Sequence, residues 1–156
     1  MKILLPVDGT ELSLHETRFA LRLVQDGLRA SFVLANVQEP ASFYEIVTSQ
    51  NPAMIESAAH EAGEDLMAPS AQLLAEAGVA FETAVVTGDP AHAMLELIEL
   101  RACDMVVMGS RALGPLRRML EGGSTSRRLL DDCPVPVLLV KPPVAADPDM
   151  EGGDAL

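Results

Sequence analysis

The sequence predicts an α/β fold, a doubly wound sandwich built on a five-stranded parallel sheet. Short apolar runs rich in Val, Leu and Ile recur along the chain, and turn residues follow them. Stretches with helical spacing of apolar residues separate these runs, and such alternation leads to parallel strands with helices on both faces. A chain of 156 residues is long enough to bury one core, so we expect a single domain.

The first elements are a strand, a helix and a strand. KILLPV at 2–7 is a short apolar run, and the DGT turn at 8–10 ends it. Apolar residues recur at helical spacing from about 12 to 26, and hydroxyl residues are available as the N-cap of this helix. SFVLANV at 31–37 is the second strand.

The middle of the chain continues the alternation. A loop around Pro40 and Pro52 leads to a long helix, roughly 53–76, which Gly78 ends. VAFETAVVTG at 79–88 supplies the third strand.

The last elements repeat the pattern twice. Asp89-Pro90 opens a helix that runs to about residue 101, and DMVVMG at 104–109 is the fourth strand. Hydroxyl residues at 124–126 can cap a final helix to residue 132, and PVPVLLVK at 134–141 is the fifth strand. Ligands of such sheets bind at the carboxyl ends of the strands, so PVDGT, NVQEP and GSRALG should converge there.

The charge distribution indicates a small anion as ligand. The net charge of −12 repels polyanions, so we expect no nucleic-acid binding. However, five of the eleven basic residues lie between positions 111 and 128, where Glu121 is the only acid. These five are Arg111, Arg117, Arg118, Arg127 and Arg128. The alternative is a solvated helix face whose charge excess arose by chance.

The remaining composition excludes several classes. The apolar runs are far shorter than the ~20 residues that cross a bilayer, so we expect a cytoplasmic protein with no membrane contact. Cys103 and Cys133 are isolated and the histidines lack ligand spacing, which indicates neither disulfide nor metal. Residues 142–156 contain four acids and no Lys or Arg, and we predict a disordered acidic tail there.

Four motifs together resemble the universal stress protein family. PVDGTELS, TGDPAHAML, DMVVMGSR and CPVPVLLVK occur in the family's order and at compatible spacing, and the resemblance covers residues 1–141. It implies a homodimeric five-stranded α/β domain that acts in stress-response signalling. In one branch of the family, it further implies ATP binding through a Gly-x2-Gly-x9-Gly-Ser/Thr signature after the fourth strand.

The signature departs from the family pattern at two points. Ala112 stands where the family has its second glycine. Nine residues separate Ala112 from Gly122, but Gly123 follows Gly122 in place of a hydroxyl residue, so the loop has one residue more than the pattern. Glycines let a backbone approach phosphate, and a helix start with free N–H groups binds anions.

The resemblance implies a nucleotide site for ATP, alone or with Mg²⁺. Asp8 and Val7 would lie near the nucleotide, Val37 beside the adenine, and Arg111 within reach of a phosphate. The full implied set is Pro6, Val7, Asp8, Val37, Met108, Gly109, Arg111, Ala112, Gly122, Gly123, Ser124 and Thr125. The alternative is a loop that only caps a helix, in a nucleotide-free member of the family that acts as a protein-interaction module.

The fifth strand is the expected dimer interface. Its two prolines confine it to a sheet edge, and Val135, Val137 and Leu139 alternate along it. The family covers this edge by pairing two copies antiparallel.

An ATP-hydrolysing enzyme is the least favoured class because no positioned general base stands out in the sequence. We therefore predict no catalytic residues. The sequence does not identify a protein partner.

Overall fold

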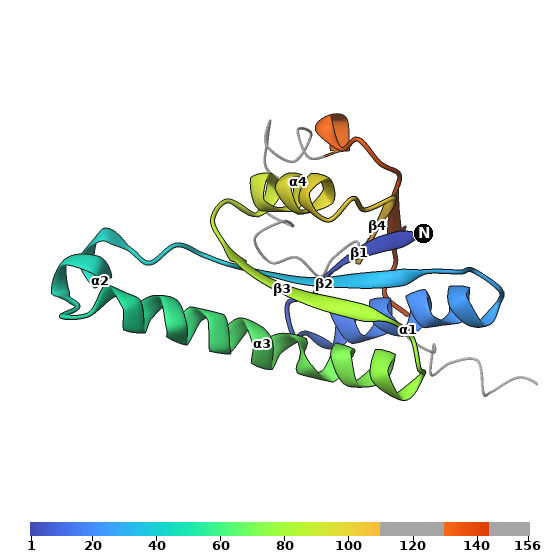
Figure 1. Ribbon diagram of the computed structural model, residues 1–156, viewed down its shortest axis with the longest axis horizontal. Helices are drawn as coiled ribbons and strands as arrows, with labels where there is room; N and C mark the ends of the chain where they lie inside the picture. The colour runs from blue at the N-terminus through green and yellow to red at the C-terminus, as the bar shows by residue number, and fades with distance from the viewer. Residues whose placement is uncertain (110–129, 144–156) are drawn as a thin grey trace, which may run out of the picture.

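The chain folds into a parallel sheet between two layers of helices (Figure 1). The computed structural model describes residues 1–109 and 130–143. Within them the sheet has five strands in the order β3-β2-β1-β4-β5, and every pair is parallel. The strands are β1 (Lys2–Pro6), β2 (Ser31–Gln38), β3 (Phe81–Thr87), β4 (Met105–Gly109) and β5 (Val137–Val140). The predicted fold class is confirmed.

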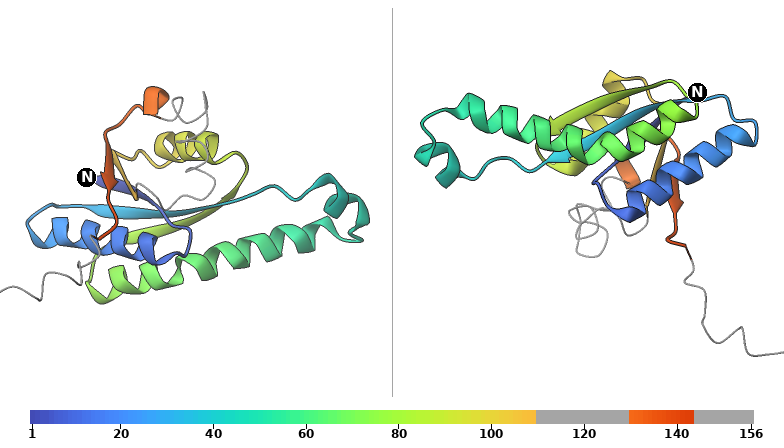
Figure 2. Two further views of the ribbon diagram at one scale, coloured as in Figure 1. Left: turned by 180° about the vertical axis from the view of Figure 1, so that it is seen from behind. Right: turned by 90° about the horizontal axis from the view of Figure 1, so that it is seen from below.

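Helices cover both faces of this sheet. The helices with both ends among the described residues are α1 (Glu11–Gln25), α2 (Phe43–Thr48), α3 (Pro52–Glu76) and α4 (Pro90–Leu100), and residues 130–132 are helical as well. Figure 2 shows α1 and α3 side by side on one face, while α4 lies on the other. The start of α3 and the whole of α2 project beyond the sheet (Figure 1).

Strict alternation along the central strands creates two apolar cores. In β1, Ile3 and Leu5 face α1 and α3, whereas Leu4 between them faces α4. All three side chains are completely buried. A strand that is buried on both faces has a continuous apolar run, which is why KILLPV was recognisable as a strand.

Two elements differ from the sequence-based prediction. The expected loop between β2 and α3 contains α2, which a capping box stabilises, because Ser42 and Glu45 bond each other's backbone N–H. The fifth strand begins at Val137 and not at residue 134. Pro134 and Pro136 have no N–H to donate to a ladder, so regular pairing begins after them, and β5 lies at the edge of the sheet as predicted.

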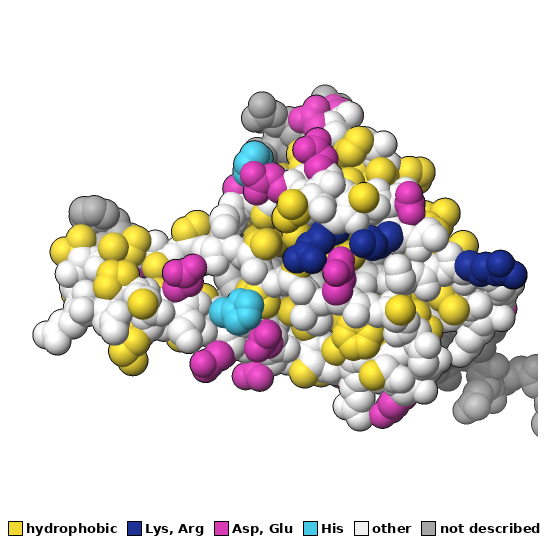
Figure 3. Space-filling model, in the orientation of Figure 1, with side chains coloured by type: hydrophobic (Ala, Val, Ile, Leu, Met, Phe, Trp, Pro, Cys, Tyr) yellow, Lys and Arg dark blue, Asp and Glu magenta, His cyan; other side chains and the backbone are white. Residues whose placement is uncertain are grey.

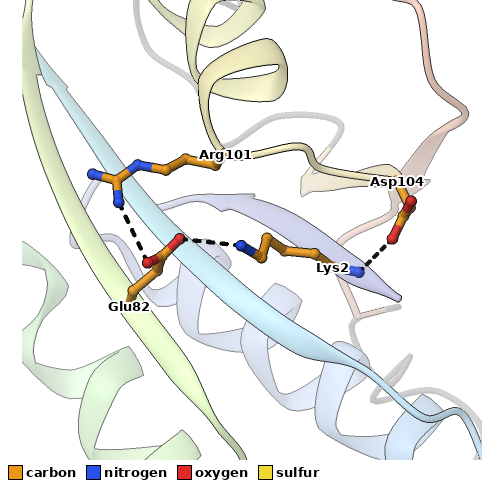
Figure 4. Close-up of polar contacts among 4 residues, drawn as sticks. All are labelled: Lys2, Glu82, Arg101 and Asp104. Atoms are coloured by element: carbon orange, nitrogen blue, oxygen red, sulfur yellow. Dashed lines mark hydrogen bonds and ion pairs between the residues drawn. The ribbon is translucent and has the colours of Figure 1, made fainter.

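An ion-pair cluster closes the amino edge of the sheet, opposite the carboxyl ends of the strands (Figure 4). Glu82 on β3 accepts from Arg101 at 3.3 Å and lies 3.7 Å from the Lys2 ammonium. The Lys2 backbone N–H donates to Asp104 at 2.7 Å. These side chains are more than a third exposed, so each pair contributes roughly 0.2–1 kcal/mol at most. The cluster has a structural role.

The described helices include none with the length and apolar character that a membrane span requires.

Candidate functional site

The strand order reverses between β1 and β4. The chain builds β2 and β3 on one side of β1 and then returns to add β4 and β5 on the other side. At such a reversal the connections leave in opposite directions and open a crevice at the carboxyl ends of the strands. Val7 and Asp8 follow β1 at this edge, and Gly109 ends β4 beside them.

A buried amide holds the end of β1 in place. Val7 donates its N–H to the Ala35 carbonyl at 2.8 Å, and its own carbonyl accepts from the Asn36 side chain at 2.7 Å. The Asn36 side-chain oxygen in turn accepts from Gln38 at 2.6 Å. Asn36 is buried, so these bonds keep its amide satisfied. Sequence reasoning missed Asn36, although a single amide inside the apolar run SFVLANV was the signal.

Asp8 is oriented by the turn that follows it. One carboxylate oxygen accepts from the Thr10 N–H at 3.0 Å and from the Thr10 hydroxyl at 2.6 Å. Thr10 also caps α1 by accepting from the Ser13 N–H. Between them Gly9 has φ of +80°, the left-handed region that favours glycine. The DGT turn therefore fixes the Asp8 carboxylate at the carboxyl edge.

Glu16 is a buried carboxyl group beside this turn. Its exposed fraction is 1%, and none of the described residues donates a hydrogen bond of good geometry to either oxygen. Burial raises its pKa from 4.5 to about 9; the Gly109 backbone opposes this shift, and the nearby Asp8 charge adds to it. Glu16 is consequently protonated and neutral at pH 7. Sequence reasoning missed it, although it lies one helical turn before Ala20 on the buried face of α1.

The apolar members of the predicted set divide between the two faces of the sheet. Val7 packs on the side of α1 and α3, whereas Val37 and Met108 pack on the side of α4. Pro6 and Met108 line a closed apolar void of about 10 Å³ under α4, which is too small for a ligand. The side chains of Pro6 and Met108 therefore pack in the core, and only the backbone of these two residues lies along the carboxyl edge of the sheet.

The other predicted nucleotide-binding residues, Arg111, Ala112, Gly122, Gly123, Ser124 and Thr125, lie outside the described residues. So does the acidic tail from residue 144. In the part of the chain that the structure describes, no three His, Cys, Asp or Glu side chains gather as metal ligands do. Asp8 is the carboxylate at the edge that could contact Mg²⁺ carried by a nucleotide.

The three predicted interface residues are not equivalent. Val135 and Val137 are partly buried and pack against the core on the α4 side. Leu139 is 44% exposed on the outermost strand. Leu139 is therefore the most exposed of the three residues and the one most accessible to a partner.

The fold and the carboxyl edge of the sheet together define the class of protein. It is a doubly wound α/β domain whose candidate site lies where the strand order reverses. The chain belongs to the universal stress protein family, whose model matches residues 1–141. The resemblance inferred from the four motifs is thereby confirmed.

Individual relatives agree with this assignment. Universal stress protein MJ0531 of Methanocaldococcus jannaschii is 28% identical over 142 residues, which cover 91% of this chain and 82% of that protein. A universal stress protein solved in complex with cAMP has a TM-score of 0.63 at 21% identity, covering 90% of this chain and 96% of its own. An Arabidopsis thaliana family member with AMP bound has a TM-score of 0.64 at 19% identity, covering 96% and 98%. At these identities the two structures show a shared fold.

Proposed function

We propose that this universal stress protein binds an adenine nucleotide, foremost ATP, at the carboxyl edge between β1 and β4. The observation that carries the proposal is the meeting of the oriented Asp8 turn with Gly109, the first glycine of the signature, at the strand-order reversal. The cAMP and AMP complexes of two proteins of the same fold support the adenine nucleotide class. In this proposal the protein acts as a homodimeric signalling module in the cytoplasm.

The carboxyl edge of the sheet is better suited to binding a nucleotide than to hydrolysing it. The Asp8 carboxylate repels phosphate and accepts hydrogen bonds from hydroxyl groups, so it suits the ribose of a nucleotide, or its phosphates only with Mg²⁺ between. Neutral Glu16 adds no negative charge against an anion at pH 7. A protonated carboxyl is also no general base. We therefore expect bound ATP to persist and the protein to be no enzyme.

Ala112→Gly is expected to tighten ATP binding roughly 5- to 30-fold. The family has glycine at this position, and alanine costs about 1–2 kcal/mol where a left-handed backbone is needed. Isothermal titration of nucleotide-stripped protein measures the change. Ala102→Gly is the matched control, because Ala102 has φ of +51° in the turn that precedes β4, at the amino edge of the sheet; it should leave the affinity unchanged.

One outcome would contradict the nucleotide proposal, and a second would contradict the role given to the signature. If neither the wild type nor Ala112→Gly binds ATP at millimolar concentration, the nucleotide-free interaction module becomes the better interpretation. If Ala102→Gly tightens binding as much as Ala112→Gly, the gain comes from general backbone freedom and not from the signature.

Leu139→Asp is expected to convert a dimer into a monomer. The edge strand β5 carries unpaired backbone groups that a second copy can pair, and a charge at the exposed Leu139 would be buried there without a partner. Light scattering should give twice the chain mass for the wild type and one chain mass for the variant. Leu100→Asp, at a 76% exposed position on α4, should leave the dimer intact. A monomeric wild type at micromolar concentration would refute the proposal.

A further inference from the structure

The projecting end of the molecule leaves bulky apolar side chains in water. Tyr44 and Val47 on α2 are 77% and 63% exposed, and Met54 at the start of α3 is 68% exposed. Figure 3 shows hydrophobic side chains gathered over this projecting part. A six-residue helix is too short to persist in isolation, and here the capping box of Ser42 and Glu45 holds it. Contiguous exposed apolar groups mark interaction sites.

A hollow lies between α2, the start of α3 and the ends of β2 and β3. Its volume is about 580 Å³, and its apolar lining includes Pro40, Ile46 and Ile55. That volume is within the range of ligand-binding clefts. None of its lining residues belongs to the predicted nucleotide-binding set, although Glu39 and Pro40 come from the NVQEP segment that follows β2 at the same carboxyl edge.

Three carboxylates rim the hollow, and no Lys or Arg of the described residues lines it. Glu39, Glu45 and Glu56 line it, and no Lys or Arg occurs anywhere between Arg29 and Arg101. Bonds from the Ser42 backbone and hydroxyl lower the pKa of Glu45 and keep it ionised. In the view of Figure 3 the Lys and Arg side chains lie on the body and none lies on the projecting part.

The three carboxylates on the rim indicate which kind of molecule can occupy the hollow. A second copy would bring the same three carboxylates against themselves, and like charges at an interface disfavour a complex. A nucleic acid or an acidic peptide would be repelled for the same reason. A basic and apolar segment matches both the hollow and its rim.

We propose that this acid-rimmed hollow docks a segment of a partner protein in which bulky apolar side chains alternate with Lys or Arg. The apolar side chains fill the space beside Ile46 and Ile55, and the basic side chains pair with Glu39, Glu45 and Glu56. Pairing with a carboxylate rim accelerates association and sets the orientation, while the apolar contact supplies most of the affinity.

The test measures fluorescence anisotropy of a labelled peptide made of Lys-Leu repeats, with a matched peptide in which every Lys is Glu. The basic peptide should bind and the acidic one should not. Glu39→Gln with Glu56→Gln should weaken binding on the order of tenfold. Glu96→Gln with Glu99→Gln removes the same charge from exposed positions on α4 and should change affinity less than about twofold.

The apolar contact has its own pair of variants. Ile46→Ser should weaken binding by about tenfold, whereas Leu100→Ser, an exposed apolar residue on α4, should have no effect. Equal weakening by the two pairs of charge variants would show general attraction to an acidic protein and overturn the proposal. An unaffected Ile46→Ser variant, the absence of binding, or a fall in mass to one chain on Ile46→Ser would overturn it as well.

Discussion

Glu16→Gln is expected to raise the free energy of unfolding at pH 7 by roughly 3 kcal/mol. Glu16 is 1% exposed, and burial raises the pKa of its carboxyl from 4.5 to about 9. Glutamine has nearly the same shape as the protonated acid and is likewise neutral, although its amide has one donor hydrogen more. The substitution therefore removes the ionisation and leaves the packing of α1 against β4 nearly unchanged.

The sign of this effect follows from proton linkage. Below pH 4.5 both the folded and the unfolded chain hold the Glu16 proton, so the group costs nothing. As the pH rises from 4.5 towards 9, the unfolded chain releases the proton and the folded chain keeps it. The stability consequently falls by about 1.4 kcal/mol per pH unit. Above the folded pKa the loss is complete and does not grow further.

Urea unfolding at several pH values between 5 and 9 measures this prediction. The difference between Glu16→Gln and the wild type should widen steadily as the pH rises. Glu61→Gln, at an exposed position on α3, is the matched control and should parallel the wild type. A Glu16→Gln variant that is less stable than the wild type at pH 8 would show that the Glu16 carboxylate is ionised and paired in the folded protein.

Gly63→Leu is expected to lower the free energy of unfolding by roughly 2 kcal/mol or more. At Gly63 α3 lies close against the sheet, because a Cβ placed on it would lie 2.5 Å from Val85 and 3.1 Å from the Asn36 side-chain oxygen. Overpacking of this kind costs about 1–3 kcal/mol and occasionally more. The gain in helix propensity over glycine, about 0.8 kcal/mol, offsets part of it.

The neighbouring position supplies the control for Gly63. Ala62 is exposed on the same turn of α3, so Ala62→Leu adds similar bulk without meeting the sheet and should stay within about 0.5 kcal/mol of the wild type. Thermal and urea unfolding of the two variants give the comparison. If Gly63→Leu is as stable as Ala62→Leu, α3 does not pack against β2 and β3 as described.

Much of the fold was predictable because its signals are local. Each central strand is a run of apolar residues between turn residues, and the prolines at 134 and 136 place the last strand at an edge without reference to any other element. The short helix α2 also had a local signal, since Ser42 and Glu45 stand at the spacing of a capping box. It was missed because a six-residue helix has too few turns to show a period.

The sequence by itself determined the strands, their parallel direction, the long helices and the position of the DGT turn after the first strand, because these follow from local patterns and from the alternation of strands and helices along the chain. Only the tertiary structure decided that Glu16 and Asn36 are buried beside that turn, and that Leu139 is exposed while Val135 and Val137 are partly buried. A polar side chain has the same pattern in the sequence whether it meets water or protein. Its burial, its hydrogen bonds and its pKa depend on which distant strand packs against it, here β4 against α1 and β1 against β2.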